Sequence, residues 1–251
     1  MATKGVKSMK LIIESISKAF KDNIVFNNAS CELEQGRIYA LLGRNGSGKT
    51  TLFDLISKRK TLENGEIYLL DGDDRIEINH DNLFYMVANP LLPNFLTGRE
   101  FFKFFIDVNK DKIKRDIDID NFFDLLSFDK READRLIQTY SLGTKNKLQM
   151  MMFLILKPKI ILMDEPLTSL DVVVQSEIKK VLKDIHKDHI IIFSTHILQL
   201  AKDICDEIVI LHNNQLKLLE DLDIEDKEFE EKIINILKGE EVSDEEFITS
   251  V

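Results

Sequence analysis

The sequence predicts an α/β fold in three parts: a core with a parallel sheet, an antiparallel β subdomain and an inserted α-helical subdomain. Two continuous apolar runs, at 160–163 and 190–193, are typical of parallel strands that are buried on both faces. Alternating and β-branched residues between positions 9 and 33 favour an antiparallel sheet instead. From about position 90 to 156 the pattern is that of Phe-rich helices, which indicates a helical insertion into the core.

Each expected element follows from a local pattern of residues. Short strands are expected at 11–13 and 24–26, because these runs are β-branched or aromatic. The other expected elements are a strand at 37–42, a helix at 51–56, strands at 66–70 and 75–78 around the turn formers of 71–74, helices at 100–105, 121–126 and 133–139, a strand at 159–164, a helix at 172–187 and a strand at 189–194. The paired Phe residues of the helical region fit core packing between helices, or a surface for a partner helix.

The net charge divides the chain into segments. Residues 220–251 carry thirteen acidic and three basic side chains, which equals the whole formal net charge of −10. We expect a flexible extension at 1–8, a main domain at 9–219 with its helical subdomain at about 90–156, and an acidic tail at 220–251. The main domain has no basic excess to neutralise phosphates, which argues against a protein that binds nucleic-acid duplexes.

The acidic tail contains one candidate helix. Ile224, Phe229, Ile233 and Leu237 approximate a single helical face among Glu and Lys residues. This face is typical of a solvated helix that caps the domain, and a segment that docks on a partner is the alternative. The residues after Gly239 are expected to be disordered.

Composition also bounds the location of the protein. No apolar run approaches the ~18 to 20 residues that a membrane-spanning helix needs. Cys31 and Cys205 are too few and too far apart to form a disulfide framework. We therefore expect a cytosolic protein.

The stretch from Gly43 to Thr51 fits the pattern G-x-x-x-x-G-K-[ST] of a phosphate-binding loop. Glycines allow backbone N–H groups to approach phosphate oxygens, and the helix that follows directs its positive end toward the same anion. Lys49 can reach the β- and γ-phosphates, and the hydroxyl of Thr50 can ligate Mg²⁺. The expected phosphate-binding residues are Gly43, Asn45, Gly46, Ser47, Gly48, Lys49, Thr50 and Thr51.

Two carboxylates follow the apolar run at 160–163. Asp164 fits the acid that completes Mg²⁺ binding in nucleotidases with such a loop, directly or through water. Glu165 lies at the mouth of the same strand, where it can polarise the attacking water as a general base. Beside a phosphate loop, this pair predicts a site for nucleotide hydrolysis.

Three further motifs follow in the order of a known family. Tyr140-Ser141-Leu142-Gly143-Thr144 resembles the signature of ATP-binding-cassette (ABC) ATPases, in which Ser141 and Gly143 match while Leu142 and Thr144 depart from it. Ser169-Leu170-Asp171 resembles the D-loop of that family, and Ser194-Thr195-His196 resembles its switch histidine. Ser141 is also a good helix N-cap, and the two roles are compatible because a capped helix N-terminus is itself an anion site.

The resemblance covers about residues 10–219 and implies an ABC-type P-loop NTPase core that binds ATP and Mg²⁺. It implies a head-to-tail dimer in which Ser141 and Gly143 cover the ATP held by the other subunit. His196 is expected to contact the γ-phosphate, and Phe20 lies where the family has an aromatic residue that stacks on adenine. ATP-driven dimerisation would then power a separate integral membrane permease, with the ATPase on the cytoplasmic face of the cell membrane.

One position departs from the family pattern in a way that concerns function. Family members carry Gln, or sometimes Glu, where the ATPase core joins the helical subdomain, and this sequence has Ala88. A methyl group cannot ligate Mg²⁺ or hold water. We therefore hypothesise that sensing of the γ-phosphate is weakened at this joint, unless Asn89 compensates.

Three functions remain open at this stage. The Tyr-Ser-Leu-Gly form of the signature resembles bacterial export cassettes for drugs and antibiotic peptides, which favours the ATPase subunit of an exporter. The second is a soluble cassette protein that serves as a regulator or assembly scaffold and takes no part in transport. A degenerate cassette that binds ATP with little turnover is the third, and Ala88 is its motivation.

Overall fold

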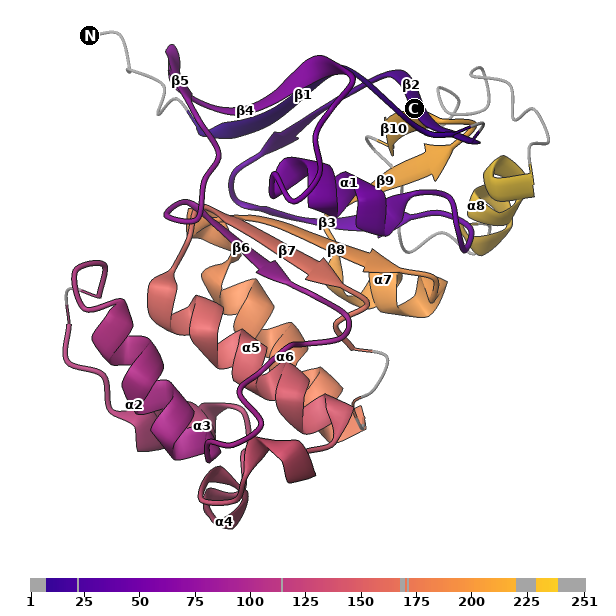
Figure 1. Ribbon diagram of the computed structural model, residues 1–251. Helices are drawn as coiled ribbons and strands as arrows, with labels where there is room; N and C mark the ends of the chain where they lie inside the picture. Colours follow the sequence, from indigo (N-terminus) through magenta and orange to yellow (C-terminus); the bar gives the residue numbers. More distant parts are fainter. Residues whose placement is uncertain are drawn as a thin grey trace, which may run out of the picture.

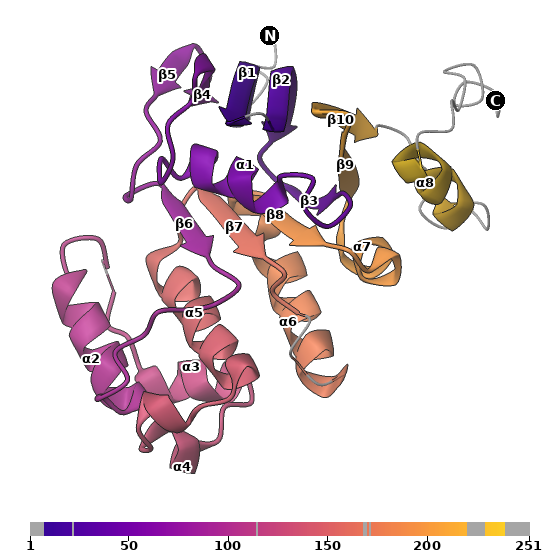
Figure 2. The same cartoon turned by 45° about the vertical axis from the view of Figure 1, so that its right-hand side comes forward.

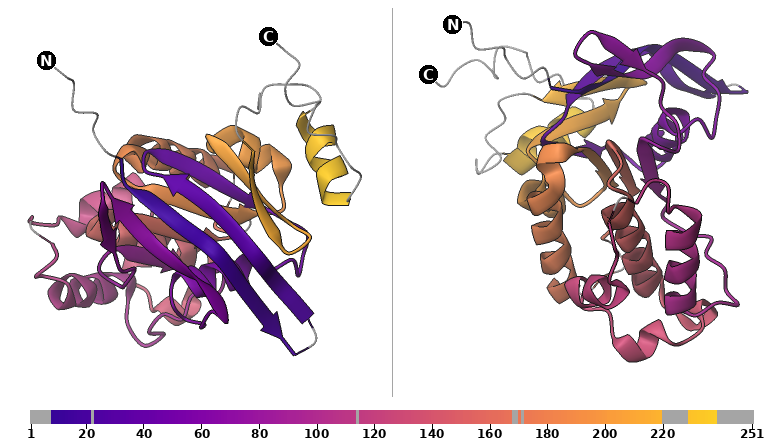
Figure 3. Two further views of the ribbon diagram at one scale, coloured as in Figure 1. Left: turned by 90° about the horizontal axis from the view of Figure 1, so that it is seen from above. Right: turned by 90° about the vertical axis from the view of Figure 1, so that its left-hand side faces the viewer.

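The computed structural model describes residues 8–21, 23–113, 115–167, 170, 172–219 and 229–238. Two sheets face each other across helix α1 (Lys49–Ile56), as Figures 1 and 3 show. The antiparallel sheet has the order β2-β1-β4-β5. Its strands are β1 (Lys10–Phe20), β2 (Asn23–Glu34), β4 (Asn64–Asp71) and β5 (Asp74–Ile76). These elements confirm the antiparallel β subdomain.

The second sheet forms the core and has the order β10-β9-β3-β8-β7-β6. Its strands are β3 (Arg37–Leu42), β6 (Leu83–Met86), β7 (Ile160–Asp164), β8 (Ile190–Thr195), β9 (Glu207–His212) and β10 (Gln215–Leu219). All neighbours are parallel except β10, which runs antiparallel to β9. The five residues of β7 and the six of β8 are all buried, which confirms that continuous apolar runs mark parallel strands covered on both faces.

The core sheet separates two hydrophobic clusters. In β3, Tyr39 and Leu41 face α1 and the antiparallel sheet, whereas Ile38, Ala40 and Leu42 face the helices on the other side. This follows from the period of two along a strand. The helices on that second side are α5 (Leu142–Leu156), α6 (Val172–Ile185) and α7 (Leu198–Ile204). The short 3₁₀ segment His186–Asp188 ends the α6 connection, so the helix expected at 172–187 stops two residues early.

The helical region lies beside α5 and contains α2 (Gly98–Val108), α3 (Ile119–Leu125) and α4 (Lys130–Ala133). The helix expected at 133–139 is wrong: α4 ends at Ala133, and a separate 3₁₀ turn covers Ile137–Thr139. Leu136, between these two elements, forms an isolated β-bridge with Thr97 and therefore cannot continue a helix. The division into core and helical subdomain, with its boundaries, remains our proposal.

Aromatic packing joins α2 and α3. Phe102 contacts Phe123 edge to face, with ring centroids 5.8 Å apart, and both side chains are fully buried. Core packing therefore explains these Phe residues, in agreement with the first of the two alternatives. Phe104 lies on the outer face of α2 and is 59% exposed.

The tail contributes helix α8 (Phe229–Lys238), which packs beside β9. Phe229 and Ile233 are fully buried and Leu237 packs against the same core, so three of the four expected apolar positions lie on the buried face. Ile224, the N-terminal extension at 1–7 and the residues after Lys238 lie outside the described residues. No helix in the described part of the chain combines the length and apolar character needed to cross a bilayer.

Candidate active site

The phosphate loop connects β3 to α1 at the C-terminal edge of the core sheet. Gly48 is the N-cap of α1 and has φ of +114°, a conformation that side chains rarely adopt. A Cβ at Gly48 would also collide with the side chain of Val25 in β2. Glycine is thus required here by backbone conformation and by space together, and the loop remains tight enough to present its N–H groups at the helix N-terminus.

Lys49 is the first residue of α1 and only 8% exposed. Its Nζ donates to the carbonyl oxygens of Gly43, at 2.8 Å, and Arg44, at 3.3 Å. Burial lowers the pKa of Lys49, and the negative charges of Glu165 and Asp164 oppose that shift. An ammonium group is therefore held over the loop, where a phosphate oxygen can replace a carbonyl as its partner.

Asp164 ends β7 and is 5% exposed. Its Oδ2 accepts from Thr50 Oγ1 at 2.8 Å, and its Oδ1 accepts from Ser194 Oγ at 2.6 Å. A carboxylate and a hydroxyl side by side are oxygen donors of the kind that Mg²⁺ prefers, with phosphate and water oxygens completing its octahedron. The residues present therefore fit Mg²⁺, for which Thr50 and Asp164 are the candidate protein ligands.

Glu165 follows Asp164 in a left-handed backbone conformation, with φ of +50°. Its N–H donates to Ser194 Oγ at 3.1 Å, which helps to hold this conformation. Its Oε1 lies 2.9 Å from Nδ1 of His196, which follows β8. The proposed base and the proposed switch residue are therefore in direct contact within one chain.

A cavity of about 390 Å³ brings most of the expected site residues together. It is lined by Asn45, Gly46, Gly48, Lys49, Thr50, Thr51, Ala88, Asp164 and Glu165. Ala88, the residue that departs from the family pattern, thus lies in the wall of the phosphate cavity itself.

Other expected site residues lie elsewhere. Ser141 is the N-cap of α5, where its Oγ accepts from the N–H of Thr144 at 3.1 Å, and Gly143 is buried in the first turn. Neither lines the phosphate cavity. Phe20 ends β1 and is 41% exposed, and the ammonium groups of Lys18 and Lys60 lie 5.2 and 5.4 Å from its ring centroid.

Further expected residues lie at or beyond the edge of the described site. Ser169 and Asp171 of the expected D-loop lie outside the described residues. Gly43 and Ser47 instead line neighbouring cavities of about 350 and 410 Å³.

Sequence reasoning missed the role of Ser194, whose hydroxyl joins Asp164 to the backbone of Glu165. A polar residue near the C-terminal end of an otherwise apolar run was the available signal, because the C-terminal ends of neighbouring parallel strands meet at one edge. The β7–β8 register pairs Asp164 with Ser194 directly.

The family model described as ABC transporter matches residues 26–168 of this sequence. This chain belongs to the ABC transporter family. It is an ATP-binding subunit of that family, and an ATPase. The expected family resemblance and the α/β fold are therefore confirmed.

Relatives among known proteins agree with this assignment. The ABC transporter ATP-binding protein YtrB of Bacillus subtilis is 30% identical over 232 residues, which cover 89% of this chain and 75% of that protein. The Fe(3+) ions import ATP-binding protein FbpC of Fusobacterium nucleatum is 29% identical, and the match covers 84% of this chain but only 58% of that protein.

Solved structures share the fold. The ATP-binding subunit of an ABC transporter superposes with a TM-score of 0.72 at 22% identity, covering 94% of this chain and 97% of the other. A dimeric post-hydrolysis state of the ATP-binding cassette MJ0796, bound to ADP and Pi, gives a TM-score of 0.70 at 18% identity, covering 82% of this chain and 96% of the other.

Proposed function

We propose that this chain hydrolyses ATP at the cavity around Lys49 and thereby powers a transporter whose permease is a separate polypeptide. The observation that carries the proposal is the convergence of Lys49, Thr50 and Asp164 on one cavity that Glu165 also lines. The phosphates of ATP would enter at the N-terminus of α1, where the backbone N–H groups and the Lys49 ammonium favour an anion. Lys49 would then exchange its carbonyl partners for phosphate oxygens.

Mg²⁺ would be held by Thr50 Oγ1 and Asp164, which lie 2.8 Å apart. When bound, the ion neutralises charge on the β- and γ-phosphates. Ser194 Oγ keeps its hydrogen bond to Asp164 Oδ1, so the carboxylate stays oriented while Thr50 turns toward the ion. Hydrogen-bonded neighbours of this kind fix the direction of a metal ligand.

Glu165 is the proposed general base, and its contact with His196 suggests how it is controlled. A neutral imidazole carries one N–H, so His196 donates either to Glu165 or to a phosphate oxygen. We propose that the γ-phosphate draws His196 away from Glu165, which frees the carboxylate to polarise the attacking water. Loss of the γ-phosphate would restore the 2.9 Å contact between the two side chains.

The site would be completed by a second subunit. Ser141 and Gly143 lie at the N-terminus of α5 and do not line the phosphate cavity of their own chain. A helix N-terminus is a ready site for an anion, so the same residues of another copy would cover the γ-phosphate. We therefore propose an ATP-dependent head-to-tail homodimer.

The permease would dock on the helical region at the cytoplasmic face of the cell membrane. Leu91 and Phe95, in the loop that follows β6, are 96% and 78% exposed, and Phe104 on α2 is 59% exposed. Several exposed apolar side chains in one region of the chain favour a protein partner. We propose export as the direction, because of the Tyr140-to-Gly143 form of the signature. The relatives named for iron and sulfate import make direction the first property to measure in a reconstituted transporter.

Glu165→Gln tests the proposed function. The amide cannot act as a base but keeps the size and the acceptor oxygen of the side chain, so the variant should bind ATP and turn it over at least about 100-fold more slowly. Because ATP would persist between the subunits, the variant should sediment as a dimer in ATP and Mg²⁺ and as a monomer in ADP.

Lys49→Ala in the same background is the matched control, because it removes phosphate binding and should leave the protein monomeric in ATP. A Glu165→Gln protein that stays monomeric at micromolar concentration with saturating ATP would contradict the dimer. Steady-state turnover of the unaltered chain separates a fast ATPase from a cassette with weak turnover. Co-purification with membranes separates a transporter subunit from a regulator that acts away from them.

A further inference from the structure

The side chain of Gln149, in the third turn of α5, is buried at the joint between the core and the helical region. It is 4% exposed, and its neighbours Leu148, Met150 and Met151 are apolar and buried. An amide in such surroundings costs free energy unless its donors and acceptor find partners. The partners of Gln149 therefore indicate what the residue does.

Those partners are both backbone groups of one residue, Val87. Gln149 Oε1 accepts from the N–H of Val87 at 3.1 Å, and Nε2 donates to the carbonyl oxygen of Val87 at 3.0 Å. The second donor of Nε2 points to Oδ1 of Asn146, one turn earlier on α5, at 3.4 Å. The paired bonds to a single residue reproduce the closely spaced pair of an antiparallel ladder, which fixes the backbone it contacts.

Val87 lies just beyond the last residue pair between β6 and β7. The last pair between β6 and β7 joins Met86 to Met163, so the ladder ends one residue before Val87. From there the chain runs alongside α5 toward α2, as Figures 1 and 2 show. Gln149 thus holds the chain at the point where it leaves the core.

The next residue, Ala88, lines the phosphate cavity together with Lys49, Asp164 and Glu165. On the other side, Ser141 caps α5 eight residues before Gln149, which is roughly 12 Å along a helix axis. One amide therefore joins the helix that carries Ser141 and Gly143 to the wall of the nucleotide cavity. The Ala88 side chain cannot make such a link, because a methyl group neither donates nor accepts.

We propose that Gln149 is the positioning residue that couples the phosphate cavity to the N-terminus of α5 through the backbone of Val87. The inference rests on the proposed function, because the orientation of α5 affects turnover only where Ser141 and Gly143 cover ATP in a second subunit. ATP that restrains the loop at Ala88 also restrains α5, and a rotation of α5 moves the cavity wall.

The test compares Gln149→Met with a matched control, Asn82→Leu, in the full chain. Asn82 lies before the other end of β6 and is also a buried amide with two backbone partners: Oδ1 accepts from Asn79 N–H at 2.9 Å, and Nδ2 donates to the Glu77 carbonyl at 2.9 Å. Both substitutions leave two backbone groups without their partner, so both should lower Tm. Only Gln149→Met should also lower kcat about tenfold while KM for ATP stays within about twofold.

Equal turnover in Gln149→Met and the unaltered chain would overturn the inference, and so would an equal loss of kcat in Asn82→Leu. If the unaltered chain does not hydrolyse ATP and the Glu165→Gln variant does not dimerise in ATP, the proposed function fails. Hydrogen exchange then decides the inference about Gln149. Adding ATP and Mg²⁺ should slow exchange at the start of α5 in the unaltered chain and in Asn82→Leu, but not in Gln149→Met. Absence of that difference refutes the coupling.

Discussion

Asp164 shows at the scale of single residues how the site is built. Its two oxygens are each held by a hydroxyl, from Thr50 on α1 and from Ser194 on β8, and its burial makes both bonds necessary. Since Ser194 also accepts from the N–H of Glu165, one hydroxyl holds both the carboxylate of Asp164 and the backbone of Glu165. The carboxylate of the proposed metal ligand and the backbone of the proposed base are therefore held by bonds within the chain itself.

Ala88 contributes only a methyl group to the cavity wall, so a single substitution can add polar atoms there. Ala88→Gln should raise ATP turnover several-fold, because an amide at this wall can hold the attacking water or ligate Mg²⁺. Turnover over a range of Mg²⁺ concentrations, with a coupled phosphate assay, checks it. Ala88→Leu is the control, since it adds similar bulk without polar atoms and should not raise turnover. Unchanged turnover in Ala88→Gln would show that sensing of the γ-phosphate is not limited by this position.

The sequence predicted best those features whose local structure depends on neighbouring positions in the chain. The cap at Ser141 and the strand-loop-helix around Lys49 depend on neighbours within a few positions, and both lie as expected. The contact of Ser194 with Asp164 spans 30 positions, and that of Gln149 with Val87 spans 62. A glutamine within a helix reads as an ordinary polar position until the packing of α5 on the sheet is known, so pattern alone could not find it.

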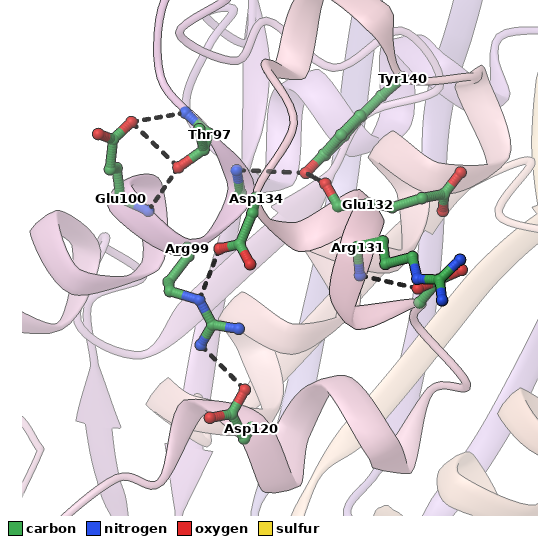
Figure 4. Close-up of polar contacts among 10 residues, drawn as sticks. Thr97, Arg99, Glu100, Asp120, Arg131, Glu132, Asp134 and Tyr140 are labelled. Carbon is green, nitrogen blue, oxygen red and sulfur yellow. Dashed lines mark hydrogen bonds and ion pairs between the residues drawn. The ribbon is translucent and has the colours of Figure 1, made fainter.

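At the scale of elements, Tyr140 joins the start of α2 to the signature segment. Its Oη accepts from the N–H of Gly98 at 3.2 Å. The same hydroxyl donates to the carbonyl oxygen of Glu132 at 2.6 Å, as Figure 4 shows. Burial raises the pKa of Tyr140 to about 12, so the hydroxyl keeps the proton that it donates. Gly98 is required here, because a Cβ would stand 2.5 Å from that hydroxyl.

Two other sets of polar contacts hold the start of α2. Thr97 and Glu100 form a capping box, in which each side chain binds the backbone N–H of the other residue. Arg99 bridges Asp120 at 2.9 Å and Asp134 at 2.8 Å, which ties α2 to α3 and to the end of α4. Polar contacts at the helix ends thus add to the aromatic packing that joins α2 and α3.

Tyr140→Phe tests the hydroxyl at this junction. The substitution keeps the ring but leaves the Gly98 N–H without its partner, while the Glu132 carbonyl oxygen keeps the N–H of Arg135 at 2.9 Å. An unpaired buried donor should lower the free energy of unfolding by about 1–3 kcal/mol. Urea denaturation measures the loss. Thr139→Val, which removes a hydroxyl bonded only to the Leu136 carbonyl on an exposed turn, should cost less than about 1 kcal/mol. An equal cost for the two variants would contradict a special role for Tyr140.

The whole molecule is a core sheet with a hydrophobic cluster on each face and the nucleotide site at one edge. Helix α8, although encoded in the acidic tail, belongs to this arrangement because Phe229 and Ile233 lie in the cluster of the helical face. Ile234 and Leu237 also face a cavity of about 350 Å³ that Asn45 and His196 line. The helical period of the tail predicted which residues turn inward, but the surface that receives them is set by β9 and was not legible in the pattern.

Phe229→Ala asks whether α8 unfolds with the rest of the chain. Phe229 is fully buried and Lys202 Nζ lies 5.8 Å from its ring centroid, so removal of the ring should cost about 3–5 kcal/mol if α8 is part of the cooperative core. Thermal and urea unfolding, followed by two probes, measure that cost. Ile234→Ala is the matched control on the same helix, because Ile234 is 40% exposed and its loss should be well below half as large. The opposite outcome is that Phe229→Ala accelerates hydrogen exchange only within α8 and leaves the midpoint of global unfolding unchanged. In that case α8 unfolds separately from the core, and its contact with the cavity that Asn45 and His196 line varies independently of global folding.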